Sequence, residues 1–145
     1  MTAGAVAQFV FRNANVNQVL AGYDRALVDS EFQIKQRQPW GEAGYVHKAI
    51  WGGKAKAYLV GQIVQLGLGK LMKSGKRLGA EAQIYQSGND VVLRMAVVPY
   101  MELFDRSEVF LLSQGVFEKI TNDDFSREKL NEVTQRMWAL GLRWG

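Results

Sequence analysis

Apolar and polar residues recur at two different spacings in the first part of the chain. Residues 6–12 are mostly apolar and predict a first strand. Apolar residues then recur three and four positions apart from Val16 to Leu27, which predicts an amphipathic helix. Asn13 or Asn15 is suited to begin this helix, because an asparagine side chain can accept a hydrogen bond from the unpaired amides of the first turn.

A two-residue spacing returns after this helix. Phe32 and Ile34 alternate with polar side chains, which predicts a half-buried strand. The turn-forming residues 38–41 separate this strand from a second run at 44–51. The two runs therefore predict a hairpin with a long loop, and the glycine pair at 52–53 breaks the chain after it.

The segment 54–74 is compatible with two structures. As a helix, it gathers most of its apolar residues on one broad side, and as a strand it alternates over residues 54–63. We favour a helix for its middle. Three glycines, Gly61, Gly67 and Gly69, weaken that prediction, since each costs about 1 kcal/mol relative to alanine inside a helix.

The second half of the chain contains the clearest strand pattern. Residues 80–84 alternate, residues 87–90 have the composition of a tight turn, and residues 91–98 form the return strand that ends at Pro99. These features predict a second hairpin.

The last part of the chain predicts a helix. Residues 101–120 fit a strand or a capped helix, and the pattern does not choose between them. Asp123 or Asp124 then caps a final helix, whose apolar residues recur at helical spacing until Gly141.

This order of elements predicts the fold class. Strands and helices alternate without the regular repeat of a parallel α/β protein, and the hairpins require antiparallel pairing. We therefore expect an α+β fold, in which helices, including the C-terminal one, pack on one side of a mostly antiparallel sheet. The whole chain, residues 1–145, is expected to form a single domain.

Composition excludes several kinds of functional site. Of the 145 residues, 48% are hydrophobic and 22% are charged, which is typical of a folded globular chain. Cysteine is absent, so disulfides, thiolate metal sites and cysteine nucleophiles are excluded. The first residues do not resemble a signal peptide, and the longest stretch without a charge, residues 57–69, is too short to cross a bilayer. We expect a cytoplasmic protein that can associate peripherally with a membrane.

The basic residues are unevenly distributed. The chain has 18 Lys and Arg residues against 14 Asp and Glu residues, a net charge of +4. Residues 43–80 contain no acidic residue, and such a window attracts phosphate-bearing partners. Its basic residues are Lys48, Lys54, Lys56, Lys70, Lys73, Lys76 and Arg77.

The residues that could perform catalysis are few. His47 is the only histidine, and no acidic residue lies near it in sequence, so we expect it to face solvent or a polar cross-strand partner. The acidic pairs Asp24 with Asp29, Glu81 with Asp90, and Asp123 with Asp124 are explained by helix capping and solvation.

The glycines at 67–69 also fail to form a nucleotide-binding loop. A phosphate-binding loop needs a glycine and a hydroxyl residue at the positions where Val64 and Leu71 stand. No catalytic residue, metal or cofactor is predicted, and enzymatic activity is the least favoured interpretation.

The sequence instead favours a binding module. We expect residues 54–77 to engage an anionic membrane surface or an amphipathic, lipid-like ligand, because an apolar stretch with a cationic end suits headgroups and acyl chains together. The predicted anion-binding residues are Lys54, Lys56, Lys70, Lys73, Lys76 and Arg77, and the predicted apolar contacts are Tyr58, Ile63, Val64, Leu68 and Leu71.

Two alternatives remain open. The same cations, together with Tyr45 and Trp51, can bind single-stranded nucleic acid, since bases stack on aromatic rings between cations. The apolar segment can also be hidden in a homo-oligomer, of which the chain would be a structural subunit.

Overall fold

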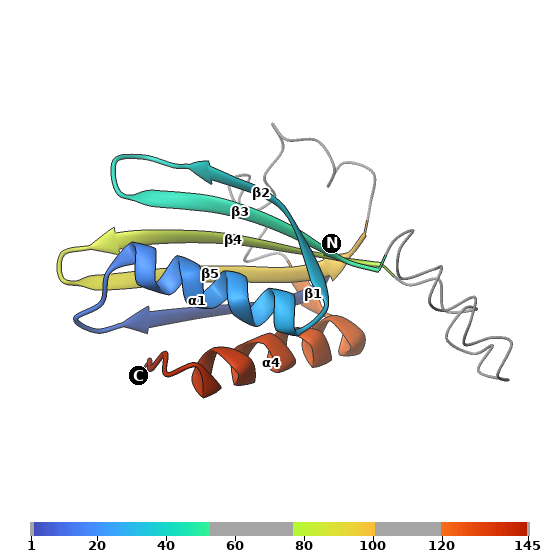
Figure 1. Cartoon of the computed structure of the whole chain (residues 1–145). Helices are drawn as coiled ribbons and strands as arrows, with labels where there is room; N and C mark the ends of the chain where they lie inside the picture. Colours follow the sequence, from blue (N-terminus) through green and yellow to red (C-terminus); the bar gives the residue numbers. More distant parts are fainter. Residues whose placement is uncertain (1, 53–76, 101–119, 145) are drawn as a thin grey trace, which may run out of the picture.

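A computed structural model describes residues 2–52, 77–100 and 120–144 (Figure 1). The described residues form an α+β fold, as the sequence predicts. The strands are β1 (Thr2–Phe11), β2 (Phe32–Pro39), β3 (Gly44–Trp51), β4 (Leu78–Ser87), β5 (Asp90–Pro99) and β6 (Ile120–Asn122), and the helices are α1 (Val16–Asp29) and α4 (Asp124–Ala139).

The strands form one sheet in the order β2-β3-β4-β5-β1-β6. Neighbouring strands run antiparallel except for β1 and β6, which pair in parallel over three residues. The two predicted hairpins are therefore confirmed as β2–β3 and β4–β5. The segment 54–74 and residues 101–119, whose structure the sequence left ambiguous, lie outside the described residues. The short strand β6 was not predicted from the sequence.

Both helices begin at residues that the sequence singled out. The side chain of Asn15 accepts a hydrogen bond from the backbone amide of Asn17 at 2.8 Å, so Asn15, and not Asn13, caps α1. The carboxylate of Asp123 accepts hydrogen bonds from the amide and the hydroxyl of Ser126 and caps α4. The first strand extends further than predicted, because β1 begins at Thr2 and pairs with β5 and β6.

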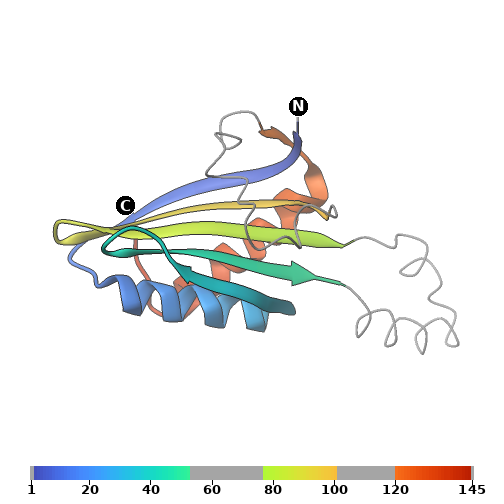
Figure 2. The same ribbon diagram turned by 90° about the horizontal axis from the view of Figure 1, so that it is seen from above.

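The two helices lie side by side on the same face of the sheet (Figure 2). Alternate residues of each strand point to this face, and they pack against one apolar stripe of each helix. The two stripes consist of Val19, Tyr23, Ala26 and Leu27 in α1, and Leu130, Val133 and Met137 in α4.

The end of the chain closes this helical layer. Leu142 follows α4 and packs onto Gly22 of α1, where a β-carbon would collide with the Cδ1 atom of the leucine. Any side chain at position 22 would therefore displace Leu142, so this glycine sets how closely α1 approaches the C-terminal segment.

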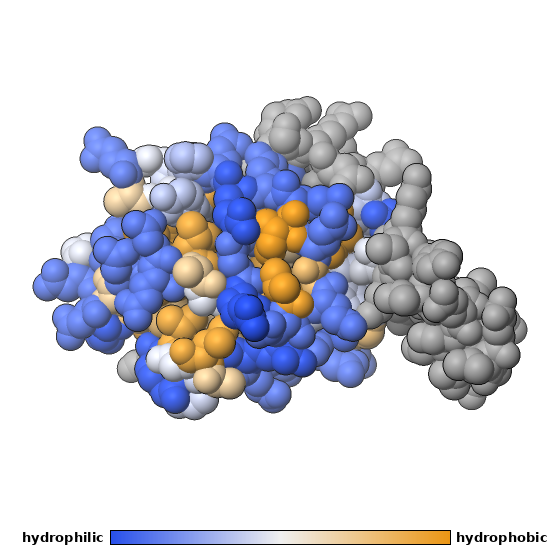
Figure 3. All heavy atoms as spheres, in the orientation of Figure 1, coloured by the Kyte–Doolittle hydropathy of each residue, from blue (hydrophilic) through white to orange (hydrophobic). Residues whose placement is uncertain are grey.

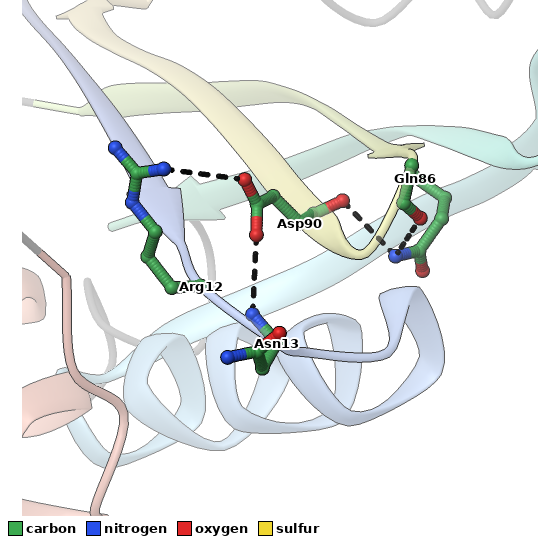
Figure 4. A network of polar contacts seen from close by, with 5 residues as sticks. Arg12, Asn13, Gln86 and Asp90 are labelled. Atoms are coloured by element: carbon green, nitrogen blue, oxygen red, sulfur yellow. Dashed lines mark hydrogen bonds and ion pairs between the residues drawn. The ribbon is translucent and has the colours of Figure 1, made fainter.

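A polar network joins the β1–α1 loop to the β4–β5 hairpin (Figure 4). The side-chain amide of Gln86 donates to the carbonyls of Ala14 and Asp90 and accepts from the backbone amide of Val16 at 2.9 Å. The carboxylate of Asp90 accepts from the backbone amide of Asn13 at 3.1 Å. One glutamine therefore satisfies backbone groups of two loops, and it positions the first turn of α1.

Replacement of Gln86 by alanine is expected to lower the free energy of unfolding by about 1–3 kcal/mol, because it leaves part-buried backbone groups without partners. Urea unfolding of Gln86→Ala measures this loss. The exposed neighbour Ser87 provides the control, and Ser87→Ala is expected to change stability by less than about 0.5 kcal/mol. Equal stabilities of the two variants would show that the Gln86 contacts contribute nothing.

Candidate functional site

Most of the predicted binding residues lie outside the described part of the chain. Arg77 is the exception, and its guanidinium lies 3.9 Å from the ring centre of Tyr100. This contact partly buries Arg77 at the start of β4. The residues outside the described ranges are Lys54, Lys56, Lys70, Lys73 and Lys76, and Tyr58, Ile63, Val64, Leu68 and Leu71; their binding roles stay predictions.

Lys48 does not belong to an exposed basic patch. It lies on the sheet face opposite the helices with only 2% of its surface exposed, directly across from Glu81 of β4. A cross-strand neighbour of opposite charge lowers the cost of burying a lysine. The acid-free window of the sequence therefore overstated the surface charge of this part of the protein.

The sequence predicted that His47 faces solvent or a polar cross-strand partner. The solvent option is wrong, whereas a polar cross-strand neighbour is present, since Arg37 of β2 lies directly opposite His47. The histidine is fully buried on the helix side of β3, and its Nε2 atom is hydrogen-bonded to the Asp24 carboxylate of α1. The other carboxylate oxygen of Asp24 accepts a hydrogen bond of 2.5 Å from Nε of Arg37. Asp24 is thus more than a solvated helix residue, because it links α1 to both β2 and β3.

The surroundings of Asp24 favour its charged form. Burial alone would raise the pKa of Asp24, but the hydrogen bonds and charges that His47 and Arg37 direct at the carboxylate outweigh burial and lower the pKa. Tyr23 packs edge-on against His47, with ring centres 5.0 Å apart. Burial, followed by the negative charges of Asp24 and Glu81, raises the pKa of Tyr23.

This cluster is better suited to holding the fold than to catalysis. His47 and Tyr23 are fully buried, so a substrate has no route to either ring. Within the described residues, His47 Nδ1 and the Tyr23 hydroxyl have no hydrogen-bond partner, so the cluster lacks a relay to a reacting group. We therefore assign the Asp24 contacts to the attachment of α1 onto the β2–β3 hairpin.

Replacement of Asp24 by asparagine is expected to cost about 1–3 kcal/mol of stability at pH 7. Because folding lowers the pKa of Asp24, its stabilisation is complete above the unfolded value of about 3.9 and is lost as the pH falls through the folded value. The difference in free energy of unfolding between wild type and Asp24→Asn should then stay constant from pH 7 to about 5 and shrink below about 4.

Urea unfolding at several pH values measures this difference in stability. Asp29→Asn is the matched control, since Asp29 pairs only with the exposed Arg25 among the interactions described and should contribute less than about 0.5 kcal/mol. Equal stabilities of wild type and Asp24→Asn at pH 7, or a difference that increases in acid, would contradict the role given to Asp24.

The sheet face opposite the helices carries a row of polar side chains. Arg94 of β5 lies opposite both Gln83 of β4 and Gln8 of β1, and the row continues through Val46 of β3 to Gln38 of β2. Nη1 of Arg94 donates to the side-chain oxygen of Gln83 at 3.3 Å. The outer residues Gln38 and Gln8 are exposed and Arg94 is half-buried, whereas Gln83 and Val46 in the middle of the row are buried. The row is therefore accessible from solvent only towards its two ends.

Two aromatic side chains stand next to this row. Trp40, in the loop between β2 and β3, is 41% exposed, and its ring centre lies 5.8 Å from that of Tyr85 in an edge-to-face arrangement. We call the two rings together with the polar row the sheet platform. It consists of Trp40, Tyr85, Gln8, Gln38 and Arg94, and the buried Gln83 is the hydrogen-bond partner of Arg94 beneath it.

Gly44 allows these two rings to meet. A β-carbon at this position would lie 2.8 Å from the carbonyl oxygen of Trp40 and 3.0 Å from Cβ of Tyr85. The amide of Trp40 donates to the carbonyl of Gly44 at 2.9 Å, which closes the loop. A glycine is therefore required here to bring the Trp40 backbone against β4.

The platform combines flat apolar surfaces with directional hydrogen-bonding groups. Indole and phenol rings offer faces for stacking, while glutamine amides both donate and accept hydrogen bonds. A guanidinium adds positive charge and planar donors. The platform is therefore suited to a planar, polar and anionic ligand.

The aromatic residues named in the nucleic-acid alternative are not on this face. Tyr45 lies on the helix side of β3, where its hydroxyl is 3.4 Å from the side-chain oxygen of Asn17 in α1. Trp51 packs against Phe125 of α4 and lies beneath the ammonium group of Lys129. Both rings pack on the helix side, and the described rings next to the polar row are Trp40 and Tyr85 instead.

Other kinds of site find no support in the described ranges. Residues 2–52, 77–100 and 120–144 hold no cluster of three or more histidines and acidic residues that could bind a metal. Neither of the two helices described is both long enough and apolar enough to cross a bilayer.

Comparison with known proteins identifies no family for this chain. No protein-family model matches the sequence, and no curated protein matches it. Among solved structures, the vertebrate conserved region of human METTL16 aligns with a TM-score of 0.44 and 10% identity, covering 92% of this chain and 98% of that chain. A likeness of this level carries no inference about function, and none is drawn from it.

Proposed function

We propose that this protein binds single-stranded nucleic acid on the sheet platform. The observation that carries the proposal is the exposed Trp40 ring packed against Tyr85, beside the exposed Gln38 at the end of the cross-strand row. Ring faces beside amides and a guanidinium are the groups that proteins use to hold unpaired bases.

Stacking supplies the first part of the interaction. Every base has a flat face, so an exposed indole binds bases of any sequence, and stacking of one base contributes about 1–3 kcal/mol. The edge-to-face contact with Tyr85 and the closed loop at Gly44 restrict the Trp40 ring before binding. A restricted ring loses less conformational entropy when a base stacks on it.

The polar row supplies the second part. Glutamine and arginine side chains bond to the edges of bases, and the row runs across β2, β3, β4, β5 and β1, at right angles to the strands. Neighbouring strands are about 4.8 Å apart, so the polar groups are spread over several strand spacings. An oligonucleotide that lies across the sheet can therefore place different nucleotides over the accessible residues Gln38, Arg94 and Gln8.

Positive charge supplies the third part. The chain carries a net charge of +4, and Arg12, whose side chain is 72% exposed, lies at the end of β1 next to the β4–β5 hairpin. Arg12 also pairs with Asp90 at 3.6 Å, so its contribution to phosphate binding is moderated. We expect affinity to fall as salt rises, because phosphate contacts release counterions.

Trp40→Ala and Tyr85→Ala are each expected to weaken binding of a labelled single strand of about 12 nucleotides by at least about fivefold. Fluorescence anisotropy measures the affinity for RNA and DNA strands. The oligonucleotide should also quench tryptophan emission in the wild type and in Tyr85→Ala, and should quench it much less in Trp40→Ala.

Two controls make this test specific. Trp138→Ala removes an equally exposed indole on the helix side, and Tyr45→Phe removes a hydroxyl there, so both should bind as the wild type does. Duplex DNA of the same length should bind more weakly, since its bases are not free to stack. Equal affinities of the wild type and the two platform variants, or no binding at low salt, would refute the proposal.

The lipid hypothesis stays a separate prediction that rests on the sequence of residues 54–77. If it holds, vesicles that contain anionic lipid should carry the protein upward in a flotation gradient, and neutral vesicles should not. The charge reversal Lys73→Glu with Lys76→Glu should reduce flotation, and Lys35→Glu, at an exposed position of β2, should change it little. Equal failure on both vesicle types would end this hypothesis.

A further inference from the structure

The two sides of the sheet end in strands that differ in how well they are protected. Within the described ranges, β2 has a strand partner on one side only. The same holds for most of β1, because its pairing with β6 covers only Thr2–Gly4 (Figure 2). A strand edge presents unpaired backbone groups, and these groups can pair with a further strand.

β2 carries the features that keep an edge strand from pairing. The side chains of Lys35 and Arg37 are exposed. The ladder with β3 is irregular between Ile34 and Gln36, and the strand ends at Pro39. Charges, bulges and proline each disfavour the addition of another strand, so this edge is suited to remain in solvent.

β1 carries none of these features. No residue of the strand is charged and none is proline, and its ladder with β5 runs from Ala5 to Phe11 without a bulge. Residues 6–10 are half-buried or exposed in one copy of the chain. A regular, uncharged edge of this kind readily pairs with another strand.

The contacts of β1 show which of its backbone groups face outward. The carbonyl of Gly4 accepts a hydrogen bond of 2.7 Å from the residue that follows β6, so it points away from β5. The side alternates along the strand, so Val6, Gln8 and Val10 also point their amides and carbonyls outward. In agreement, the Val6 carbonyl accepts from Nη1 of Arg127 at 3.3 Å. Within the described ranges, the outward groups of Gln8 and Val10 have no hydrogen-bond partner.

We propose that β1 pairs with β1 of a second copy of this chain, antiparallel about a twofold axis at Gln8. Extended backbone fills a strand edge, because its amides and carbonyls have the matching spacing. Pairing of a strand with its own copy buries the same surface on both chains, so assembly stops at the dimer. Two six-stranded sheets then become one continuous sheet.

The sequence of β1 is complementary to itself in this register. Val6 lies opposite Val10 of the partner subunit, and the two copies of Gln8 lie opposite each other, so every outward residue has a hydrogen-bonded partner. The Val6 carbonyl has a second lone pair for this bond. On the helix side, Phe9 lies opposite Ala7 of the partner subunit, which pairs a large ring with a small side chain. No like charges meet, whereas β2 paired with its own copy would bring cations together.

Apolar surface also favours this edge over the helix layer as the contact. Phe9 is half-buried, and its ring centre lies 4.7 Å from that of Trp144. A strand added beside β1 covers more of the Phe9 ring, so the dimer buries apolar surface as well as forming hydrogen bonds. The helix-side view in Figure 3 shows apolar side chains separated by hydrophilic ones, so that face offers no continuous apolar surface.

The dimer goes beyond the nucleic-acid proposal and does not depend on it. It also differs from the oligomer hypothesis based on the sequence, because it uses β1 and not the apolar segment 54–74. Gln8 ends the polar row of the platform, so the rows of the two copies would meet at the axis. Dimerisation is measured without nucleic acid, so failure of one proposal is distinguishable from failure of the other.

A single introduced cysteine tests the register, because the chain contains no cysteine. Residues opposite each other in a hydrogen-bonded pair have Cα atoms about 5.5 Å apart, within the range that a disulfide spans. Gln8→Cys should therefore form a disulfide-linked dimer under mild oxidation, measured by non-reducing electrophoresis. Gln33→Cys, at an exposed position of the β2 edge, is the control and should be cross-linked at least about fivefold less.

Light scattering of the full chain over a wide concentration range tests the dimer itself. The wild type should reach twice the mass of the chain. Val10→Pro removes an outward amide and leaves the β5 ladder intact, so it should raise the dimer dissociation constant at least about tenfold. Val10→Ala keeps that amide and should remain dimeric.

Amide hydrogen exchange of the wild type gives a test that needs no variant. The amides of Gln8 and Val10 should be protected at high protein concentration and should lose this protection on dilution. The amides of Ala7 and Phe9 point toward β5 and should stay protected at both concentrations.

Three results would overturn the proposal. The first is a wild-type chain that stays monomeric at every concentration. The second is a dimer in which Gln33→Cys cross-links as well as Gln8→Cys. The third is a dimer that Val10→Pro leaves intact while Gln8 and Val10 exchange freely, since another surface would then hold the two copies together. Oligonucleotide affinity, measured in parallel, reports on the platform separately.

Discussion

The burial of one face of the sheet by α1 and α4 determines where every other feature of the molecule can lie. Successive residues of a strand point to opposite faces, so once the helices cover one face, each strand residue is assigned either to the apolar core or to the far side. In β4, Ala80, Ala82 and Ile84 enter the core, and Glu81 and Gln83 are therefore placed on the opposite face. The platform is a consequence of this alternation, because Tyr85 continues the second set.

Two polar contacts give this apolar packing a single register. Hydrophobic burial is not directional, and it would tolerate a shift of α1 along the sheet. The carboxylate of Asp24 fixes the middle of α1 to β2 and β3, and the amide of Gln86 fixes its first turn to the β4–β5 hairpin. Each contact leaves buried groups without partners if α1 moves, so the cost of displacement is high.

The sequence predicted the described elements other than β6, but it did not predict their contacts. Alternation around Ile84 and helical spacing around Leu130 are local patterns, and they predicted β4 and α4 correctly. The partner of His47 could not be found in this way, because Asp24 is 23 positions away and meets it only when α1 packs on β3. Lys48 was misassigned for the same reason, since its burial depends on the register that places Glu81 beside it.

The sequence indicates the platform less clearly than it indicates the helices and strands. The apolar alternation of β4 and β5 already implies a second face that carries Gln83, Tyr85 and Arg94, and the turn chemistry around Gly41 already implies that Trp40 stands at a loop. What the sequence lacks is the order of strands across the sheet. Gln8 reaches the row only because β1 pairs with β5, a contact between residues that are far apart in the chain.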